Sequence, residues 1–177
     1  MTNTIRVLGI KIAWPVIIVD LGKGFLAPFI AAKFMTAYSP EWTWLPLVSG
    51  FLAILGHSFT CMAGFRGGKG VLTALGVFLC LCPVTALSSF AVWIILTAAT
   101  KYVSVGSITA CVALCAFSIM GYVGAPYPVY DKIDLPLMIT CCVVGVFVIV
   151  KHRGNIKRLM NGTENGFGSK RKTPKEI

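Results

Sequence analysis

Residues 71–120 read VLTALGVFLCLCPVTALSSFAVWIILTAATKYVSVGSITACVALCAFSIM, and Lys101 is the only charged residue among them. A helix needs about 20 apolar residues to cross the roughly 30 Å hydrocarbon core of a bilayer. Residues 70–82, 84–100 and 103–124 are therefore predicted membrane segments, and Pro83 marks the turn between the first two. The first of these segments is short, which predicts either a half-span or a strongly tilted helix.

The rest of the chain has the same apolar character. Of its 177 residues, 56% are hydrophobic and 12% are charged, and the mean hydropathy is +0.82. A soluble domain needs more polar surface than this. Further apolar segments at 12–34, 42–57 and 135–150 complete the prediction of an all-α integral membrane protein, a polytopic helical bundle with about six membrane segments. We assign residues 1–168 to one membrane domain and 169–177 to a basic cytoplasmic tail.

The net charge of +10 comes from basic residues that lie between and after the apolar segments. This arrangement suits anionic headgroups or anionic substrates better than nucleic acid. Cytoplasmic loops carry an excess of Lys and Arg, which here predicts that both termini are cytoplasmic. The connection 124–134 would then lie outside as an ordinary polar turn. The predicted cytoplasmic side holds Arg6, Lys11, Arg66, Lys69, Lys101, Lys151, Arg153, Lys157, Arg158 and the tail, and the other side holds Lys33 and Lys132.

Charged residues and cysteines also occur in or beside the apolar segments. The first segment contains Asp20 and Lys23, which are three positions apart and are predicted to form an intramembrane ion pair with a structural role. Six of the seven cysteines lie within apolar segments, and only Cys61 lies in a predicted loop. We interpret the cysteines as small packing residues rather than disulfide partners or metal ligands.

A glycine-rich motif, GHSFTCMAGFRGGKG at residues 56–70, leads into the segment 70–82. Gly67, Gly68 and Gly70 would let backbone N–H groups converge on an anion at a helix N-terminus, where Lys69 would add a full positive charge. A Walker A loop does not fit, because the lysine of that motif is followed by Ser or Thr rather than Gly. Glycine turns between membrane helices also serve packing, so the motif is interpreted as either a phosphate cradle or a packing device.

A second motif, KHRGNIKRLMNGTENG at residues 151–166, follows the last segment on the same predicted side. Asn155 and Arg158 are three positions apart, so on a helix they share a face and could meet one anionic ligand. Lys151 and Lys157 are interpreted as topological anchors. A histidine, an asparagine and a glutamate are not required for anchoring, so the motif indicates a further role.

These motifs resemble, in the same order, signatures of the bacterial acyl-phosphate:glycerol-3-phosphate acyltransferases, the PlsY family. GHSFTCMAGFRGGKGVLTALG (56–76) resembles the second signature, and HRGNIKRLMNGTEN (152–165) resembles the third. Near the start, TN (2–3), IRVLG (5–9) and DLGKG (20–24) resemble the end of the first signature and the helix that follows it. The resemblance extends over about residues 2–166.

The resemblance implies transfer of a fatty acyl group from acyl phosphate to the 1-hydroxyl of glycerol 3-phosphate, giving lysophosphatidic acid and inorganic phosphate at a bacterial inner membrane. It implies no cofactor, no metal and no covalent acyl-enzyme intermediate. The partners that it implies for the protein are acyl phosphate, glycerol 3-phosphate and the lipid bilayer. Because both substrates carry phosphate, a basic face is expected.

The resemblance also implies roles for individual residues. By similarity, the catalytic residues are Lys69, His57, His152 and Asn155, and the substrate-binding residues are Asn3, Arg6, Gly67, Gly68, Gly70 and Arg158. Lys69 and the glycine backbone would bind phosphate, with His57 shaping that site. Arg6, His152, Asn155 and Arg158 would hold and polarise the acyl phosphate or its partner. Glu164 would order the third signature.

The chain departs from the family pattern near its start. The family normally begins with a further membrane helix, seven in all, and a Ser-Gly-Asn-rich front half of the first signature. A proline that the family often has near Thr60 or Cys61 is also absent. We expect the chain as given to be less active than a form that also carries this further helix and the front half of the first signature.

Two other classes of protein are alternatives. One is a nonenzymatic membrane or lipid-binding paralogue that keeps the fold after losing the first helix. The other is a channel or transporter, whose site should lie near the membrane midplane. Only Asp20 and Lys23 are obvious polar residues there, while the others gather on one face, so the sequence favours the enzyme.

Overall fold

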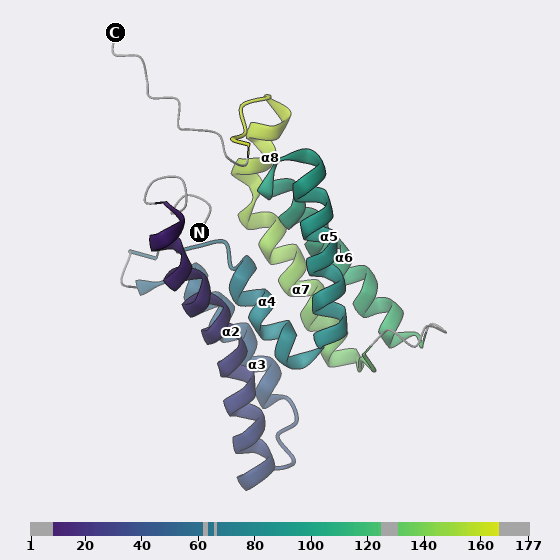
Figure 1. Cartoon of the computed structure of the whole chain (residues 1–177). Helices are drawn as coiled ribbons and strands as arrows, with labels where there is room; N and C mark the ends of the chain where they lie inside the picture. Colours follow the sequence, from purple (N-terminus) through teal and green to yellow (C-terminus); the bar gives the residue numbers. More distant parts are fainter. Residues whose placement is uncertain (1–8, 62–63, 66, 125–130, 167–177) are drawn as a thin grey trace.

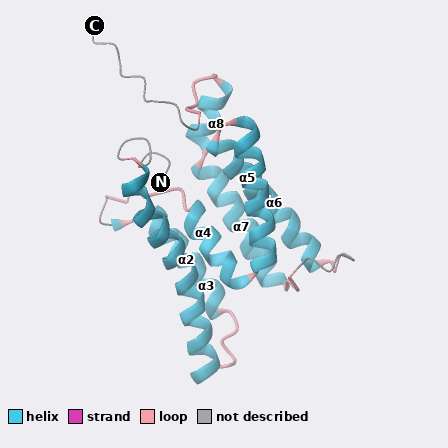
Figure 2. Ribbon diagram, in the orientation of Figure 1, coloured by secondary structure: helices cyan, strands magenta, loops and turns pink. Residues whose placement is uncertain are grey.

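The computed structural model describes residues 9–61, 64–65, 67–124 and 131–166, and the regular structure in these ranges is helical, as Figure 2 shows. The predicted all-α fold is therefore confirmed. In chain order the helices are α2 (Ile10–Tyr38), α3 (Leu45–Ser58), α4 (Val71–Leu81), α5 (Pro83–Thr100), α6 (Val103–Tyr122), α7 (Leu135–Lys151) and α8 (Arg153–Met160) (Figure 1). The predicted tail, 169–177, lies outside the described residues.

Each of the six predicted segments coincides with one helix, and α8 is an additional short helix. Within the described ranges, three helices are long and apolar enough to cross a membrane: α2, α5 and α6. A fourth crossing results if α7 and α8, which are bent by 54° at His152, count as one span. With 14 and 11 residues, α3 and α4 are only about 21 and 17 Å long, shorter than the hydrocarbon core. The number of six full spans is therefore not confirmed.

Helix α2 is continuous through Pro15 and Pro28 and presents two different faces. Its buried positions recur at helical spacing and form one stripe, made up of Ala13, Asp20, Gly24, Pro28 and Ala31. The opposite side exposes large apolar side chains, namely Trp14, Ile18, Val19, Leu26 and Ile30. In a bilayer these side chains would face lipid, whereas the stripe packs against protein. Helix α2 is therefore not exposed to lipid on all sides.

Close backbone approach holds α2 against α4. A Cβ placed on Gly76 of α4 would overlap the carbonyl oxygen of Leu21, so the absence of a side chain allows the two helices to touch. Small residues at such crossings are typical of membrane helix pairs, where van der Waals contact replaces the hydrophobic driving force. The helix α2 also packs on α3, while α5, α6 and α7 pack in sequence order. The shared core includes Ile54, Val77, Phe78, Leu114, Val144 and Val148.

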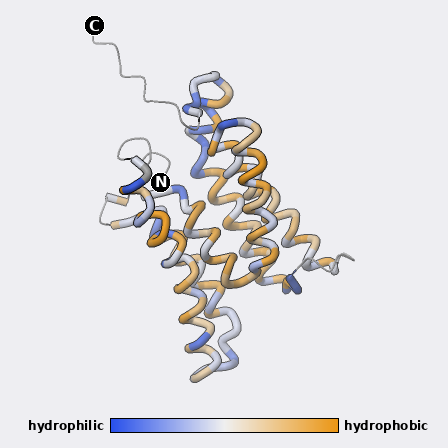
Figure 3. The backbone as a smooth tube through the Cα atoms, viewed as in Figure 1, coloured by the Kyte–Doolittle hydropathy of each residue, from blue (hydrophilic) through white to orange (hydrophobic). Residues whose placement is uncertain are grey.

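The chain runs back and forth, so its turns gather at two ends of the bundle (Figure 1). One end carries the C-terminus of α3, the N-terminus of α4, the α5–α6 turn and the α7–α8 junction, and we call it the motif end. The opposite end, the far end, carries residues 39–44, the turn at Pro83 and residues 131–134. Figure 3 shows hydrophobic residues along the length of the helices and hydrophilic ones concentrated toward the ends. The two sequence motifs are therefore brought to the same end, as predicted.

Two acidic residues cap helices at the far end. The Asp131 carboxylate accepts hydrogen bonds from the backbone N–H groups of Thr85 (2.8 Å) and Val84 (3.4 Å) in the first turn of α5. Asp134 accepts from the N–H of Leu137 (2.9 Å) at the start of α7. Carboxylates satisfy the unpaired N–H groups of a helix N-terminus and complement its dipole. Residues 131–134 therefore do more than connect α6 to α7, because Asp131 caps the start of α5 and Asp134 caps the start of α7.

Candidate active site

The glycine-rich loop rests on the C-terminal end of α3. The Gly68 N–H donates to the main-chain carbonyl of His57 (3.2 Å), which α3 leaves without a helical partner. A Cβ on Gly68 would overlap the His57 imidazole, and a Cβ on Gly67 would overlap the main chain of His57 and Ser58. Of the two interpretations left open by the sequence, the packing role of Gly67 and Gly68 is confirmed. Phosphate binding by the loop stays a prediction.

Lys69 joins the glycine-rich motif to the second motif. The Lys69 ammonium donates to the Asn155 side-chain oxygen at 2.5 Å, across 86 positions of sequence. Lys69 is half-buried just before α4, and Asn155 is buried on α8. This bond holds the charge of Lys69 beside α8.

A carboxylate organises the second motif. Glu164 accepts hydrogen bonds from the side-chain nitrogens of Asn155 and Arg158, each at 2.7 Å, and from the Ser104 hydroxyl at 2.9 Å. Its own side chain is only 6% exposed. We call Lys69, Ser104, Asn155, Arg158 and Glu164 the Glu164 network. The predicted shared face of Asn155 and Arg158 is confirmed, and the anion that they meet in the structure is the Glu164 carboxylate.

The network keeps Glu164 ionised. Burial by itself would raise the pKa of this carboxyl group, because a charge is less stable away from water. The hydrogen bonds from Asn155, Ser104 and Arg158, together with the charge of Arg158, outweigh burial, so the pKa lies below its ordinary value. A fixed negative charge therefore orients the amide of Asn155 and the guanidinium of Arg158.

His152 lies at the junction of α7 and α8. Its Nδ1 is 2.8 Å from the Val148 carbonyl oxygen. A carbonyl can only accept, so Nδ1 carries a proton. The main-chain oxygen of His152 accepts from the N–H groups of Asn155 (2.8 Å) and Ile156 (2.9 Å) and so begins α8. The histidine is thus buried at the bend that carries Asn155 to the Glu164 network.

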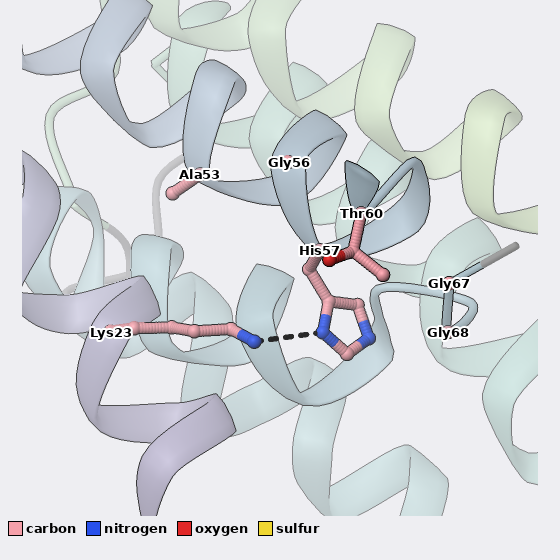
Figure 4. Close-up of a pocket in the computed structure, with 7 residues that line it drawn as sticks. All are labelled: Lys23, Ala53, Gly56, His57, Thr60, Gly67 and Gly68. Carbon is pink, nitrogen blue, oxygen red and sulfur yellow. Dashed lines mark hydrogen bonds between the residues drawn. The ribbon is translucent and has the colours of Figure 1, made fainter. Parts of the chain in front are cut away.

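His57 belongs to a second charged cluster with Asp20 and Lys23, and Figure 4 shows its contact with Lys23. The Lys23 ammonium lies 2.6 Å from Asp20 Oδ1 and 2.9 Å from His57 Nδ1, and the same Asp20 oxygen is 3.3 Å from His57 Nδ1. The predicted Asp20–Lys23 ion pair is confirmed. Sequence reasoning missed its contact with His57, because no local pattern relates two residues that are 34 positions apart.

This cluster borders a cavity of about 420 Å³ beside the glycine-rich loop. The cavity is lined by Lys23, Ala53, Gly56, His57, Thr60, Gly67 and Gly68 (Figure 4). The loop that carries Lys69 therefore has the cavity and His57 on one side, while Lys69 itself reaches Asn155 of α8. The site joins residues from α2, α3, the loop before α4, α6, and α8 with the turn that follows it.

A further contact was not predicted. The Lys151 ammonium donates to the Ser58 carbonyl at the end of α3 (3.2 Å) and lies 4.4 Å from the centre of the Phe59 ring. Lysine near a helix C-terminus complements the helix dipole. Lys151 therefore ties α7 to the base of the glycine-rich loop, in addition to any anchoring role.

Two of the predicted site residues, Asn3 and Arg6, lie outside the described residues. Among the described ones, no group of three or more His, Cys, Asp or Glu side chains is arranged to hold a metal ion. All seven cysteines have free thiols, and Cys61 is exposed.

The fold and the motifs agree with comparisons to known proteins. Residues 1–162 match the family model described as glycerol-3-phosphate acyltransferase. The chain is 42% identical over 166 residues to a glycerol-3-phosphate acyltransferase of Fusobacterium nucleatum, covering 94% of this chain and 78% of that one. It is 41% identical over 164 residues to glycerol-3-phosphate acyltransferase 2 of Bacillus anthracis, covering 93% and 77%.

Solved structures show the same relationship. The crystal structure of PlsY (YgiH), an integral membrane glycerol 3-phosphate acyltransferase, matches in its glycerol 3-phosphate form with a TM-score of 0.78 and 36% identity, over 94% of this chain and 76% of that chain. Its lysophosphatidic acid form matches with the same TM-score and identity, over 94% and 78%. An all-helical membrane protein with these motifs at one end is thus an integral membrane acyltransferase. The chain belongs to the glycerol-3-phosphate acyltransferase family, the PlsY family.

Proposed function

We propose that this protein transfers a fatty acyl group from an acyl phosphate to the 1-hydroxyl of glycerol 3-phosphate. The products are lysophosphatidic acid and inorganic phosphate, and the reaction takes place at the cytoplasmic face of a bacterial inner membrane, with both chain termini on that side. The observation that carries the proposal is the Lys69–Asn155 hydrogen bond of 2.5 Å, which unites the two motifs in one site. Residues 1–168 form the acyltransferase domain in this proposal, and 169–177 form a basic cytoplasmic tail.

The chemistry requires cations and positioned donors. An acyl phosphate is a mixed anhydride, so the 1-hydroxyl oxygen can attack the carbonyl carbon while the bond from that carbon to the phosphate oxygen breaks. The hydroxyl proton ends on the released phosphate in the net reaction. Negative charge develops on the carbonyl oxygen and on the leaving phosphate, and preorganised donors stabilise such charge best.

In this proposal, residues of the Glu164 network would supply these donors. Lys69 would bind a substrate phosphate together with the backbone of Gly67, Gly68 and Gly70. A guanidinium has five N–H donors in a planar fork, so the bond from Arg158 Nε to Glu164 leaves donors for a second anion.

Three further residues would support these contacts. His152 and Asn155 would help hold and polarise the acyl phosphate or its partner. Glu164 would fix the orientation of its neighbours and does not need to touch substrate. Of the predicted substrate-binding residues near the chain start, Asn3 and Arg6 would complete the site.

The test is an assay of the purified protein in lipid nanodiscs. Phosphate release from palmitoyl phosphate should depend on glycerol 3-phosphate, and mass spectrometry with NMR should identify the 1-acyl product. Transfer from acyl-coenzyme A but not from acyl phosphate would overturn the assignment of acyl phosphate as the donor. A 2-acyl product would overturn the assignment of the 1-hydroxyl as the acceptor. Absence of transfer from either donor would overturn the proposed function as a whole.

A further inference from the structure

We propose that the Asp20–Lys23 pair is a positioning device for His57. It fixes the imidazole in one neutral tautomer, with the proton on Nε2, and through this ring it holds the glycine-rich loop that carries Lys69. The tautomer follows from the structure alone. The consequence for acyl transfer rests on the function proposed above.

The position of the proton on the His57 ring can be inferred from which neighbouring groups are hydrogen-bond donors. A lysine ammonium has donors only, so the 2.9 Å contact requires His57 Nδ1 to accept. The proton of a neutral ring must then be on Nε2. A proton on Nδ1 could reach Asp20 at 3.3 Å, but it would also oppose the donors of Lys23 at the shorter distance. Asp20 lies 2.6 Å from Lys23 and so keeps the ammonium aimed at the ring.

Two of the three side chains in the cluster are shielded from water, whereas the Lys23 side chain is 40% exposed. The side chains of Asp20 and His57 are 11% and 16% exposed, so water competes weakly for their hydrogen bonds. Charged groups inside a membrane segment are costly unless they are paired, and removal of one partner leaves the other uncompensated. The shielded Asp20 carboxylate therefore holds the Lys23 ammonium beside the His57 ring.

His57 transmits the constraint to the loop by two routes. Its main-chain oxygen accepts from the Gly68 N–H, and its Nε2 and Cε1 atoms occupy the space where a side chain on Gly68 would lie. Rotation of the ring would remove this support and open the loop toward the cavity. Because Lys69 is the next residue, its ammonium would lose its fixed position relative to Asn155.

The second histidine provides an internal reference. His152 Nδ1 lies 2.8 Å from the Val148 carbonyl, so in that ring the proton must be on Nδ1. The chain has two histidines, and the structure assigns them opposite tautomers. Histidine ring nitrogens with and without a proton have widely separated ¹⁵N resonances, so one spectrum can distinguish the two cases.

The first test is ¹⁵N NMR of the full chain, labelled at histidine, in bilayers at pH about 8, where unperturbed imidazoles are neutral. Labelling of glycine carbonyls identifies His57, because it follows Gly56. The expected spectrum shows a protonated Nε2 for His57 and a protonated Nδ1 for His152. A protonated Nδ1 at His57, or an equal mixture of its tautomers, would overturn the proposal without any substitution.

The second test uses the substitutions Lys23→Met and Lys23→Arg, with Lys33→Met as a control on the same helix. Lys33 lies near the far end of α2, and its ammonium is 5.7 Å from the centre of the Phe29 ring. In Lys23→Met the His57 tautomers should become mixed while the His152 signals stay unchanged. The value of kcat for acyl transfer should fall by about 10- to 100-fold, because misplacement of a catalytic group by about 1 Å has effects of this size.

The kinetic pattern separates positioning from binding. Lys23→Met should change KM for glycerol 3-phosphate less than it changes kcat, because the charge of Lys69 remains. Lys23→Arg keeps donors and should restore part of kcat, and Lys33→Met should change neither value. An altered His57 tautomer with normal kcat would overturn the link to the loop. If the wild-type protein transfers no acyl group, the proposed function fails, while the NMR result still decides the tautomer.

Discussion

Lys69 and Asn155 are 86 positions apart in the chain and are joined by a 2.5 Å hydrogen bond from the ammonium to the amide oxygen. The same amide donates through its nitrogen to Glu164 at 2.7 Å. Asn155 therefore has a fixed orientation, with its oxygen toward a cation and its nitrogen toward an anion. These two hydrogen bonds couple the loop before α4 to helix α8, so a substitution in either element should alter the geometry of the other.

We expect Lys69→Ala to lower kcat/KM for acyl transfer by about 10- to 100-fold while the protein still inserts and folds. A charge-assisted contact to a phosphate contributes about 1.5–3 kcal/mol, which corresponds to this range. The matched control is Lys157→Ala, which removes an exposed lysine of α8 at the same end of the bundle. Steady-state kinetics at equal amounts of folded protein provide the measurement. Unchanged kinetics in Lys69→Ala would reject its phosphate-binding role.

Glu164→Gln should destabilise the fold by about 1–3 kcal/mol at pH 7, because it weakens the charge-assisted bonds to Asn155 and Arg158. The pKa of Glu164 in the folded protein is below its ordinary value of 4.5. The ionised carboxylate therefore stabilises the fold above that pH, and this contribution is lost as the pH falls through the lowered folded-state pKa. The stability difference between wild type and variant should be largest near neutral pH and shrink below about pH 4.

Thermal unfolding in detergent across this pH range measures the Glu164 effect. Glu41→Gln is the control, because Glu41 is exposed in the connection between α2 and α3. A stability difference for Glu164→Gln that grows as the pH falls would contradict the assignment of the carboxylate as the organiser of the network.

The apolar segments could be predicted because their signal is local. A run of apolar residues broken at Pro83 indicates two helices without knowledge of any contact, and Pro83 is indeed at the first turn of α5. The number of crossings was not settled in this way, because α3 and α4 are apolar but short. Apolar composition shows that a helix avoids water, whereas length decides whether it crosses.

The site was predictable only where its geometry is local. Helical spacing placed Asn155 and Arg158 on one face, and it also paired Asp20 with Lys23. Glu164, whose carboxylate joins Asn155 and Arg158, was assigned a supporting role by resemblance. Its contacts could not be predicted, because they depend on the turn after α8, where the Thr163 N–H donates to the Arg158 carbonyl at 2.8 Å. Contacts across 34 or 93 positions, such as Lys23–His57 and Lys151–Ser58, depend on helix packing that one sequence does not reveal.

Asp131→Ala should lower the stability of the protein by about 1 kcal/mol, the usual loss for removal of a helix N-cap. Asp131→Asn keeps an oxygen acceptor and should lose less. The cap lies at the far end, so acyl transfer per folded molecule should stay unchanged in both variants. Thermal unfolding combined with the phosphate-release assay tests this separation. A specific loss of turnover at full stability would show that Asp131 acts on the site rather than on the start of α5.

Acyl transfer should not depend on added divalent metal. The proposed reaction uses Lys69, Arg158 and backbone donors to stabilise negative charge, which is the task that a metal ion performs in many phosphoryl and acyl transfers. Activity in a chelator should equal activity in added Mg²⁺ within about twofold. The assay should use protein that was purified in the chelator from the start. Loss of turnover in the chelator, with rescue by one specific ion, would refute this prediction.

The motif end should face the cytoplasm, because the excess of basic residues lies there and such residues resist transfer across the membrane. Cysteine labelling in intact cells tests this, after Cys61, the exposed native thiol, is replaced by serine. A cysteine at position 132 should react with a membrane-impermeant maleimide from outside, whereas one at position 101 should react only after the cells are opened. The two positions lie at opposite ends of the bundle, in the connection before α7 and in the turn between α5 and α6. The reverse pattern would place the Glu164 network on the outer side and would overturn the proposed cytoplasmic orientation.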